Sequence, residues 1–216
     1  MDKSREAVKI YDLIAKDYAD SFTKNKVESE IIDKFLDELP INPRVLDVGC
    51  GNSDYFEHFS KRNVDYTGID LSSEMLKIAR KNFPNGNFIN MDMRSILFNT
   101  NFFAGIFCFY SLIHIPKKEV ISVLESFSRI LKPNGKILFA LQEGNNEVFV
   151  PEPFLPEKQL FINLISEEEI RKLLEKIGMK IIYSKRIKPT SKYQLNYNKL
   201  FVIASKWNQK IYIPES

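Results

Sequence analysis

The sequence is poor in residues that would indicate several classes of protein. It has only two cysteines, Cys50 and Cys108, in 216 residues. We therefore expect no disulfide framework, and a cytoplasmic protein. No apolar run approaches the length that crosses a bilayer, and the N-terminus lacks the apolar region of a signal peptide, so no membrane association is expected. The net charge of +3 is too small to predict a nucleic-acid surface.

Hydrophobic residues make up 44% of the chain, enough for the core of one α/β domain. Apolar periodicity predicts helices over residues 4–20 and 27–39. Strands and helices then alternate, and Ser72 is expected to cap its helix. The predicted strands are Arg44–Val48, Val64–Asp70, Asn87–Asn90, Phe102–Tyr110 and Lys136–Gln142, with helices over 53–62, Ser72–Asn82 and Lys117–Leu131. This alternation predicts a parallel, doubly wound sheet.

The last third of the chain has a different pattern. Residues 143–165 contain three prolines and weak periodicity, which predicts a loop or a small cap inserted into the domain. A helix is expected over Ser166–Gly178, beginning with a capping-box-like Ser-Glu-Glu-Glu. Met179–Ile187 and Lys199–Ser205 are expected to be two strands that pair antiparallel. We therefore expect one domain over 1–216, with an N-terminal helical segment at 1–40.

A strand that runs into Gly-x-Gly and then a helix, as in Val45–Ser53, is typical of a ligand-binding turn. Three acidic residues limit which ligand this turn could bind. Asp47 lies in the turn, where it would repel a pyrophosphate and favour a cationic ammonium or sulfonium. Asp70 ends the next strand, where an acid accepts hydrogen bonds from ribose hydroxyls. Asp92 follows the third strand and is expected to accept a bond from an adenine amino group.

These segments resemble the motifs of the class I S-adenosylmethionine-dependent methyltransferases. Residues 45–51 (Val-Leu-Asp-Val-Gly-Cys-Gly) resemble motif I, 68–75 the ribose-binding motif and 90–93 the adenine-contacting motif. Residues 107–114 and 129–135 are similar to the later strand-end and turn motifs. The resemblance implies a Rossmann-like seven-stranded sheet, mostly parallel with an antiparallel C-terminal strand and helices on both faces.

The resemblance also implies the cofactor, S-adenosyl-L-methionine, and the residues that would bind it. These are Tyr18, Asp47, Gly49, Cys50, Gly51, Asp70, Leu71, Met75, Asp92, Met93 and Tyr110. Residues 11–18 are similar to small-molecule members whose first helix closes over the cofactor. One departure is Ser53, which stands where the family often has a third glycine. We expect it to cap the following helix.

Methyl transfer requires alignment of acceptor and donor, and a catalytic base is optional. His114 is a candidate base because its pKa range suits that work, although a structural role is the simpler alternative. Tyr11, Gln142, Glu143 and Phe154 are candidate acceptor-binding residues. For Tyr11, packing of an amphipathic helix is the slightly favoured alternative, and for Glu143 a solvated charge at the start of a loop is an equal alternative. Phe149 and Phe161 are also expected to shape the acceptor pocket.

The sequence thus predicts a methyltransferase that acts on an N or O atom of a small molecule, as a monomer or homodimer. Residues 108–111 (Cys-Phe-Tyr-Ser) lack the Asn/Asp-Pro-Pro-Tyr typical of amino-methylation of DNA bases, so no nucleic-acid partner is expected. No cluster with metal-ligand spacing is present, and no metal is predicted. Two alternatives are a cofactor-binding protein without turnover and a nicotinamide-dependent oxidoreductase. Asp47 and the missing Gly-x-x-Gly continuation argue against the latter.

Overall fold

A seven-stranded sheet forms the centre of the molecule in a computed structural model, which describes residues 2–21, 26–189 and 194–207. Its strand order is β3-β2-β1-β4-β5-β9-β8, and all neighbouring pairs are parallel except those that β9 makes with β5 and β8. The strands are β1 (Arg44–Val48), β2 (Asp65–Asp70), β3 (Asn87–Asn90), β4 (Phe103–Phe109), β5 (Leu131–Gln142), β8 (Met179–Ile187) and β9 (Lys199–Lys206). This confirms the predicted doubly wound, mostly parallel sheet.

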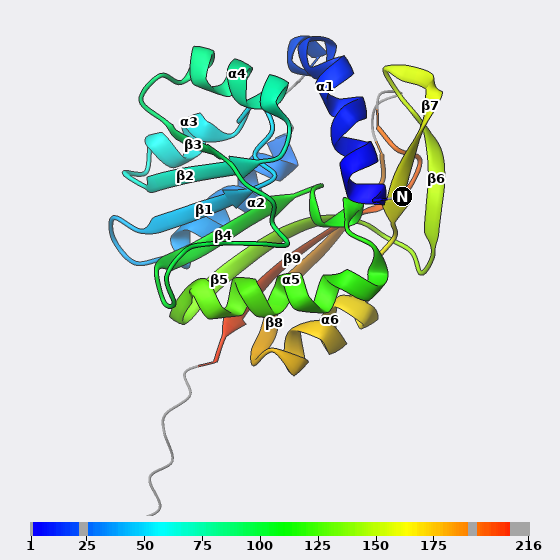
Figure 1. Cartoon of the computed structure of the whole chain (residues 1–216). Coiled ribbons are helices and arrows are strands. Elements are labelled where there is room, and N and C mark those ends of the chain that lie inside the picture. The colour runs from blue at the N-terminus through cyan, green and yellow to red at the C-terminus, as the bar shows by residue number, and fades with distance from the viewer. Residues whose placement is uncertain (1, 22–25, 190–193, 208–216) are drawn as a thin grey trace, which may run out of the picture.

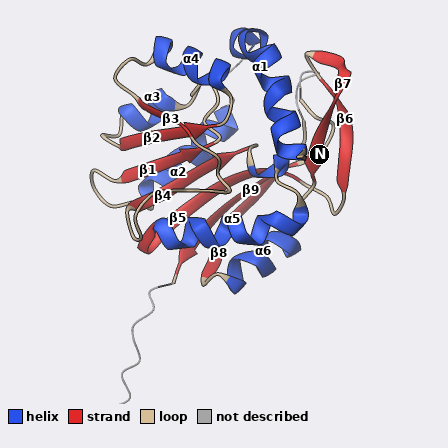
Figure 2. Cartoon of the chain, viewed as in Figure 1, coloured by secondary structure: helices blue, strands red, loops and turns tan. Residues whose placement is uncertain are grey.

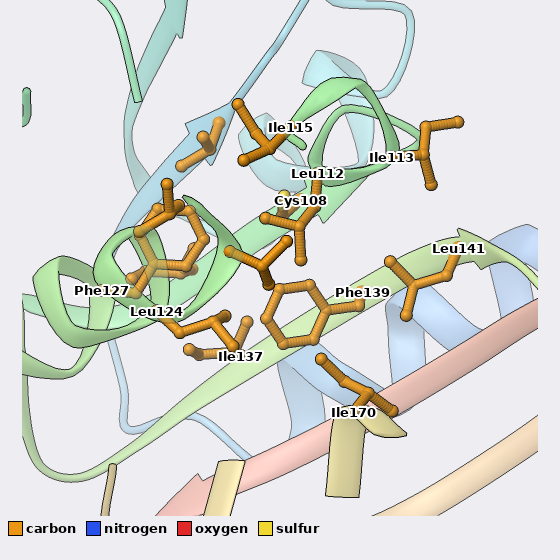
Figure 3. Packing of buried hydrophobic residues seen from close by; sticks show 14 of the residues in the cluster. Cys108, Leu112, Ile113, Ile115, Leu124, Phe127, Ile137, Phe139, Leu141 and Ile170 are labelled. Carbon is orange, nitrogen blue, oxygen red and sulfur yellow. The ribbon is translucent and has the colours of Figure 1, made fainter. Parts of the chain in front are cut away.

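Helices cover both faces of the sheet (Figures 1 and 2). Strand residues alternate between two buried clusters, because successive side chains point to opposite faces. One cluster packs against α5 (Lys117–Ile130) and α6 (Glu167–Lys176), and the other against α2 (Lys26–Asp37), α3 (Phe56–Ser60) and α4 (Ser73–Asn82). In Figure 3, Leu124 and Phe127 of α5 lie over Ile137 and Phe139 of β5.

The first helix, α1 (Lys3–Ser21), lies across the end of the sheet rather than on either face. It contacts α4 on one side and a two-stranded hairpin on the other (Figure 1). Its buried side chains follow helical spacing, with Ala7, Ile10 and Ile14 facing inward. The carboxyl ends of the central parallel strands, where open α/β sheets bind ligands, therefore lie beneath α1.

The segment that we expected to be a loop or small cap, 143–165, forms that hairpin. Its strands are β6 (Glu147–Glu152) and β7 (Leu155–Asn163), paired antiparallel. Its two strands were not predicted, because prolines 151, 153 and 156 masked the alternation over 147–152, where exposed and partly buried side chains alternate. Proline is tolerated here because a two-stranded ribbon consists only of edge strands.

Several local predictions can be compared with the structure. The side chain of Ser72 caps α4 by accepting from the Met75 N–H, and Ser166 caps α6 by accepting from the Glu169 N–H. Both caps were predicted. The helix expected over 53–62 is only the five-residue α3, and Ser53 does not cap it. Ser53 instead has a φ of +64°, because it occupies the left-handed position that a third glycine would take.

Candidate functional site

The turn after β1 leaves space for a ligand. Gly49 and Gly51 both have positive φ, at +71° and +52°. A Cβ on Gly49 would lie 2.2 Å from the Cβ of Ser111, so the turn packs tightly against the end of β4. A Cβ on Gly51 would meet no atom within 4 Å, although the residue lines two cavities. The absence of a side chain at Gly51 is therefore what keeps this wall of the cavities open.

Asp70 connects this turn to the next strand. One of its carboxylate oxygens accepts from the Gly51 N–H at 2.8 Å, and the other accepts from the Ser72 N–H at 2.7 Å. Each oxygen keeps a lone pair for a ligand, since a carboxylate accepts about four hydrogen bonds. Burial is the largest effect on this carboxyl and raises its pKa. Ribose hydroxyls are donors that match such an acceptor.

Two adjoining cavities lie at the carboxyl ends of β1, β2, β4 and β5. The first, of about 130 Å³, has mostly apolar walls and is lined at its polar side by Asp70 and Asp92. The second, of about 460 Å³, is lined by the hairpin and the ends of β4, β5 and β9. They share six lining residues, which are Tyr11, Tyr18, Gly49, Gly51, Phe109 and Tyr110.

The structure brings nearly all of the predicted site residues to these cavities. Every residue named for the cofactor lines one or both, and so do His114, Tyr11, Gln142 and Phe154. Glu143 is the exception. It pairs with Arg186 at 2.6 Å and lines neither cavity, because residues at successive positions after a strand point in different directions.

Two phenylalanines that we expected to shape the pocket also lie elsewhere. Phe149 is 59% exposed on the hairpin, and Phe161 is buried against it with ring centroids 5.6 Å apart. The ammonium of Lys3 lies 4.4 Å from the Phe161 ring. Of the three phenylalanines, only Phe154 at the hairpin tip reaches the cavity. The other two stabilise the contact between the hairpin and α1.

Asp47 is buried below the glycine turn. Its side chain accepts a hydrogen bond from the Tyr66 hydroxyl at 2.6 Å, and the residue is only 4% exposed. Burial raises the pKa of this carboxyl from 3.8 to about 7, although the Tyr66 bond opposes the shift. Asp47 lines the second cavity, so a cation bound there would favour its ionised form.

Asp92 lines the first cavity, as predicted for an adenine contact, but both of its oxygens already accept from Arg94. The Nη2 atom of Arg94 lies 2.7 Å from Asp92 Oδ2, and Arg94 also donates at 2.9 Å to Asp2, the residue directly before α1. These bonds lower the pKa of Asp92 against the opposing effect of burial. The Asp92 carboxylate therefore also helps fix the start of α1 over the site.

A hydrogen-bonded chain joins α1, the end of β4 and the hairpin. The Nδ1 atom of His114 lies 3.0 Å from the carbonyl oxygen of Phe161, and its Nε2 lies 3.1 Å from the Tyr11 hydroxyl. A carbonyl only accepts, so Nδ1 carries the proton and Nε2 accepts from Tyr11. Burial lowers the pKa of His114 to about 4 and raises that of Tyr11 well above its ordinary value. The pair is thus neutral.

This chain changes the interpretation of both residues. His114 is a weak base whose two ring nitrogens already have partners, so it orients Tyr11 rather than taking a proton from a ligand. The hydroxyl proton of Tyr11 is used by His114, so its oxygen offers lone pairs to the cavities that it lines. Tyr11 therefore does more than pack α1 against its neighbours, because its hydroxyl oxygen also faces the cavities.

A buried ion pair at the far wall of the second cavity was not predicted. Glu28 of α2 pairs with Lys199 of β9 at 2.8 Å, and both side chains are under 10% exposed. The hydroxyls of Tyr110, at 2.7 Å, and Tyr55 also donate to Glu28. No sequence signal indicated this pair, because Glu28 lies in an ordinary amphipathic helix 171 residues before its partner.

Tyr110 combines this contact with an unusual backbone. Its φ is +51°, which is costly for a residue with a large side chain. Its N–H donates to the Ala140 carbonyl at 2.9 Å, and its hydroxyl donates to Glu28. These bonds hold the ring at the junction of the two cavities.

Comparison with known proteins agrees with this geometry. Residues 45–135 match the model of a methyltransferase domain family. The chain is 32% identical over 134 residues to the dTDP-3-amino-3,4,6-trideoxy-alpha-D-glucopyranose N,N-dimethyltransferase of Streptomyces venezuelae, covering 60% of this chain and 54% of that protein. It is 29% identical over 173 residues to the ubiquinone biosynthesis O-methyltransferase of Nitrosomonas europaea, covering 77% and 66%. The chain spans about half the length of the first curated relatives that it matches.

A solved structure extends the similarity to the fold. The 1,6-didemethyltoxoflavin-N1-methyltransferase of Burkholderia thailandensis, with S-adenosylhomocysteine bound, has a TM-score of 0.71 and 18% identity, covering 96% of this chain and 91% of that one. In the described part of the chain, no helix is long and apolar enough to cross a membrane. A methyltransferase domain model matches residues 45–135, and the fold of the chain is that of S-adenosylmethionine-dependent methyltransferases; both findings agree with the predicted family and its cofactor.

Proposed function

We propose that this protein transfers a methyl group from S-adenosylmethionine to an N or O atom of a small molecule. The observation that carries the proposal is the pair of adjoining cavities, which share a wall of glycines and aromatic rings at the carboxyl ends of the central strands. A methyl donor in one cavity and an acceptor in the other would meet at that wall.

The first cavity has the chemistry that an adenosine group requires. Asp70 offers acceptors for two ribose hydroxyls, and Met75, Met91 and Met93 supply an apolar, adaptable surface for a base. Because Gly51 has no side chain, it leaves space beside the turn for the ligand. Asp47 lines the second cavity beside the glycine turn that both cavities share, and its negative charge there suits the ammonium and sulfonium groups of the cofactor.

The bound cofactor would supply the electrophilic methyl carbon, already activated by positive sulfur. The residues of this chain would then align the acceptor and exclude water. Tyr11 and Tyr18 of α1 line the wall that the two cavities share, and residues of the hairpin line the second cavity. Tyr11 can accept a hydrogen bond from the acceptor, and His114 fixes the orientation of that hydroxyl.

Binding and turnover can be tested separately. S-adenosylmethionine, S-adenosylhomocysteine and NADH are titrated into the full chain by calorimetry, and release of S-adenosylhomocysteine is then measured across a panel of amines, phenols and carboxylic acids. We expect both methionine derivatives to bind and one acceptor class to be methylated. Binding of NADH alone would refute the proposal. If the cofactor binds but no acceptor is methylated, the result would favour the alternative, a protein that binds the cofactor without turnover.

A further inference from the structure

The second cavity contains more negative than positive groups. Among the described residues that line it are four carboxylates, Glu28, Asp47, Asp54 and Glu152, and a single cation, Lys199. Lys199 is paired with Glu28 at 2.8 Å and buried with it. Its charge is therefore already neutralised, and none of the described residues of this wall offers a free cation to an anionic ligand.

Glu152 differs from the other three carboxylates. Glu28 is satisfied by Lys199 and two tyrosines, Asp47 accepts from Tyr66, and Asp54 accepts from Asn52. Glu152 uses one oxygen, Oε2, to accept from the Phe154 and Leu155 N–H groups at the hairpin tip, at 2.6 and 2.9 Å.

The other oxygen of Glu152, Oε1, is left for a ligand. In the part of the chain that the structure describes, it has no hydrogen bond, although the residue is only 3% exposed. Unlike the fully buried Oε1 of Gln142, this oxygen is accessible at the cavity, where a hydrogen-bond donor or a cation can reach it. Glu152 lines the second cavity, so a ligand there would supply that partner.

Aromatic rings surround the same region. Tyr11 and Tyr18 of α1 meet edge to face with centroids 6.0 Å apart, and Tyr18 meets Phe154 in the same way at 6.0 Å. All three rings line the cavity together with Glu152. Aromatic faces beside a carboxylate attract ammonium groups, because the ring faces carry partial negative charge.

Two neutral groups also require donors. Gln142, at the end of β5, is 5% exposed and lines the cavity, and its Oε1 is a buried acceptor without a hydrogen-bond partner. The Tyr11 oxygen also offers lone pairs, since its proton is donated to His114. A ligand with several N–H donors would satisfy both groups and Glu152.

We propose that the methyl acceptor is an aliphatic amine that enters the second cavity as a cation and carries no anionic group. This inference rests on the proposed function. The ammonium group donates to Glu152 Oε1 and lies against the aromatic rings. One of its protons passes to that carboxylate, the nitrogen lone pair forms the new N–C bond with the methyl carbon, and the C–S bond breaks with its electron pair left on sulfur.

Three ligands of the same shape test the charge preference. Cyclohexylamine, cyclohexanol and cyclohexanecarboxylate are titrated by calorimetry into the full chain saturated with S-adenosylhomocysteine at pH 7.5. We expect the amine to bind at least about tenfold more tightly than the alcohol, the size of one charge-assisted hydrogen bond, and the carboxylate not to bind. Equal affinity for all three, tighter binding of the carboxylate, or no binding of the amine would overturn the inference.

Substitutions in the hairpin test whether the amine binds beside Glu152 and Phe154. Glu152→Gln keeps an oxygen for the two backbone N–H groups and replaces only the charge, so it should weaken amine binding about tenfold and leave the alcohol unchanged. Phe154→Leu should weaken the amine about threefold through loss of a ring face. Glu157→Gln is the matched control, because Glu157 is exposed on β7 of the same hairpin and lines neither cavity.

S-adenosylhomocysteine affinity separates the two proposals. It should be the same in all three variants, which also shows that they are folded. If the unmodified chain binds neither methionine derivative, the proposed function fails and the inference fails with it. If the cofactor binds normally but Glu152→Gln and Glu157→Gln have the same effect on the amine, the proposed function stands and the amine site is refuted.

Discussion

Replacing Asp47 by asparagine should make the protein more stable and bind its cofactor less well. Asp47 is buried beside the glycine turn with one hydrogen bond from Tyr66, so its negative charge lacks the solvation of water. Asparagine has nearly the same shape and can still accept from Tyr66. The substitution therefore removes the charge and little else.

The magnitude follows from the pKa of the carboxyl, which burial raises from 3.8 to about 7. Between these values the unfolded chain is ionised and the folded chain is protonated, so the stability of the native protein falls as pH rises through this window. Because one pKa unit corresponds to about 1.4 kcal/mol, the full cost is about 4 kcal/mol above pH 7 and under about 1 kcal/mol at pH 4. Asparagine does not titrate and avoids this cost.

Urea denaturation of both proteins at several pH values between 4 and 8 measures this difference. We expect Asp47→Asn to be more stable by an amount that grows with pH up to about 7 and then stays constant. Calorimetry at pH 8 should show S-adenosylmethionine binding weakened by about tenfold, since a favourable charge interaction is lost. A stability difference that does not vary with pH, or a less stable variant at pH 8, would refute the reasoning.

Other predictions concern the turn and the tyrosine–histidine chain. Asp70→Ala should abolish cofactor binding, whereas Asp70→Asn should retain part of it; unchanged affinity in the alanine variant would show that the ribose contact is misassigned. Gly49→Ala should destabilise the fold by about 1–3 kcal/mol, measured by urea denaturation, because its Cβ would clash with Ser111, while Gly51→Ala should mainly weaken cofactor binding by calorimetry. His114→Ala and Tyr11→Phe should each slow turnover, and the double variant should be little slower than either, because the two side chains act through one hydrogen bond. Additive losses of rate would show that the two residues act independently. The pH–rate profile should show no histidine titration near pH 6.5, since burial lowers the pKa of His114 to about 4.

Much of the cofactor side of the site could be predicted from local sequence. Asp47, Gly49, Gly51 and Asp70 lie at the ends of short apolar strands, and the parallel order of those strands brings them to one edge. Helix caps were also predictable, because Ser72 and its bonding partner are three residues apart. Such features depend on neighbours in sequence, or on the regular geometry of a parallel sheet.

The acceptor side depended on contacts between distant segments. The hairpin was obscured by its prolines, and Glu143 lay outside the cavity while Glu152 lay inside it. Nothing in the local sequence distinguishes these two glutamates, since their surroundings are set by how β6 and β7 fold back over α1. For the same reason, only the contacts of His114 with Tyr11 and Phe161 favoured an orienting role over that of a candidate base.

The sequence by itself thus determined the sheet and the cofactor turn, because strand periodicity and the φ requirements of glycine are local properties. Only the tertiary structure decided which carboxylates are buried, which are paired and which has an unused oxygen. Those properties follow from partners such as Lys199, which lies 171 residues from Glu28, and from the hairpin that places Glu152 in the wall of the second cavity. The methyl donor is therefore encoded in contiguous motifs, and the chemistry of the acceptor site arises from packing between distant segments.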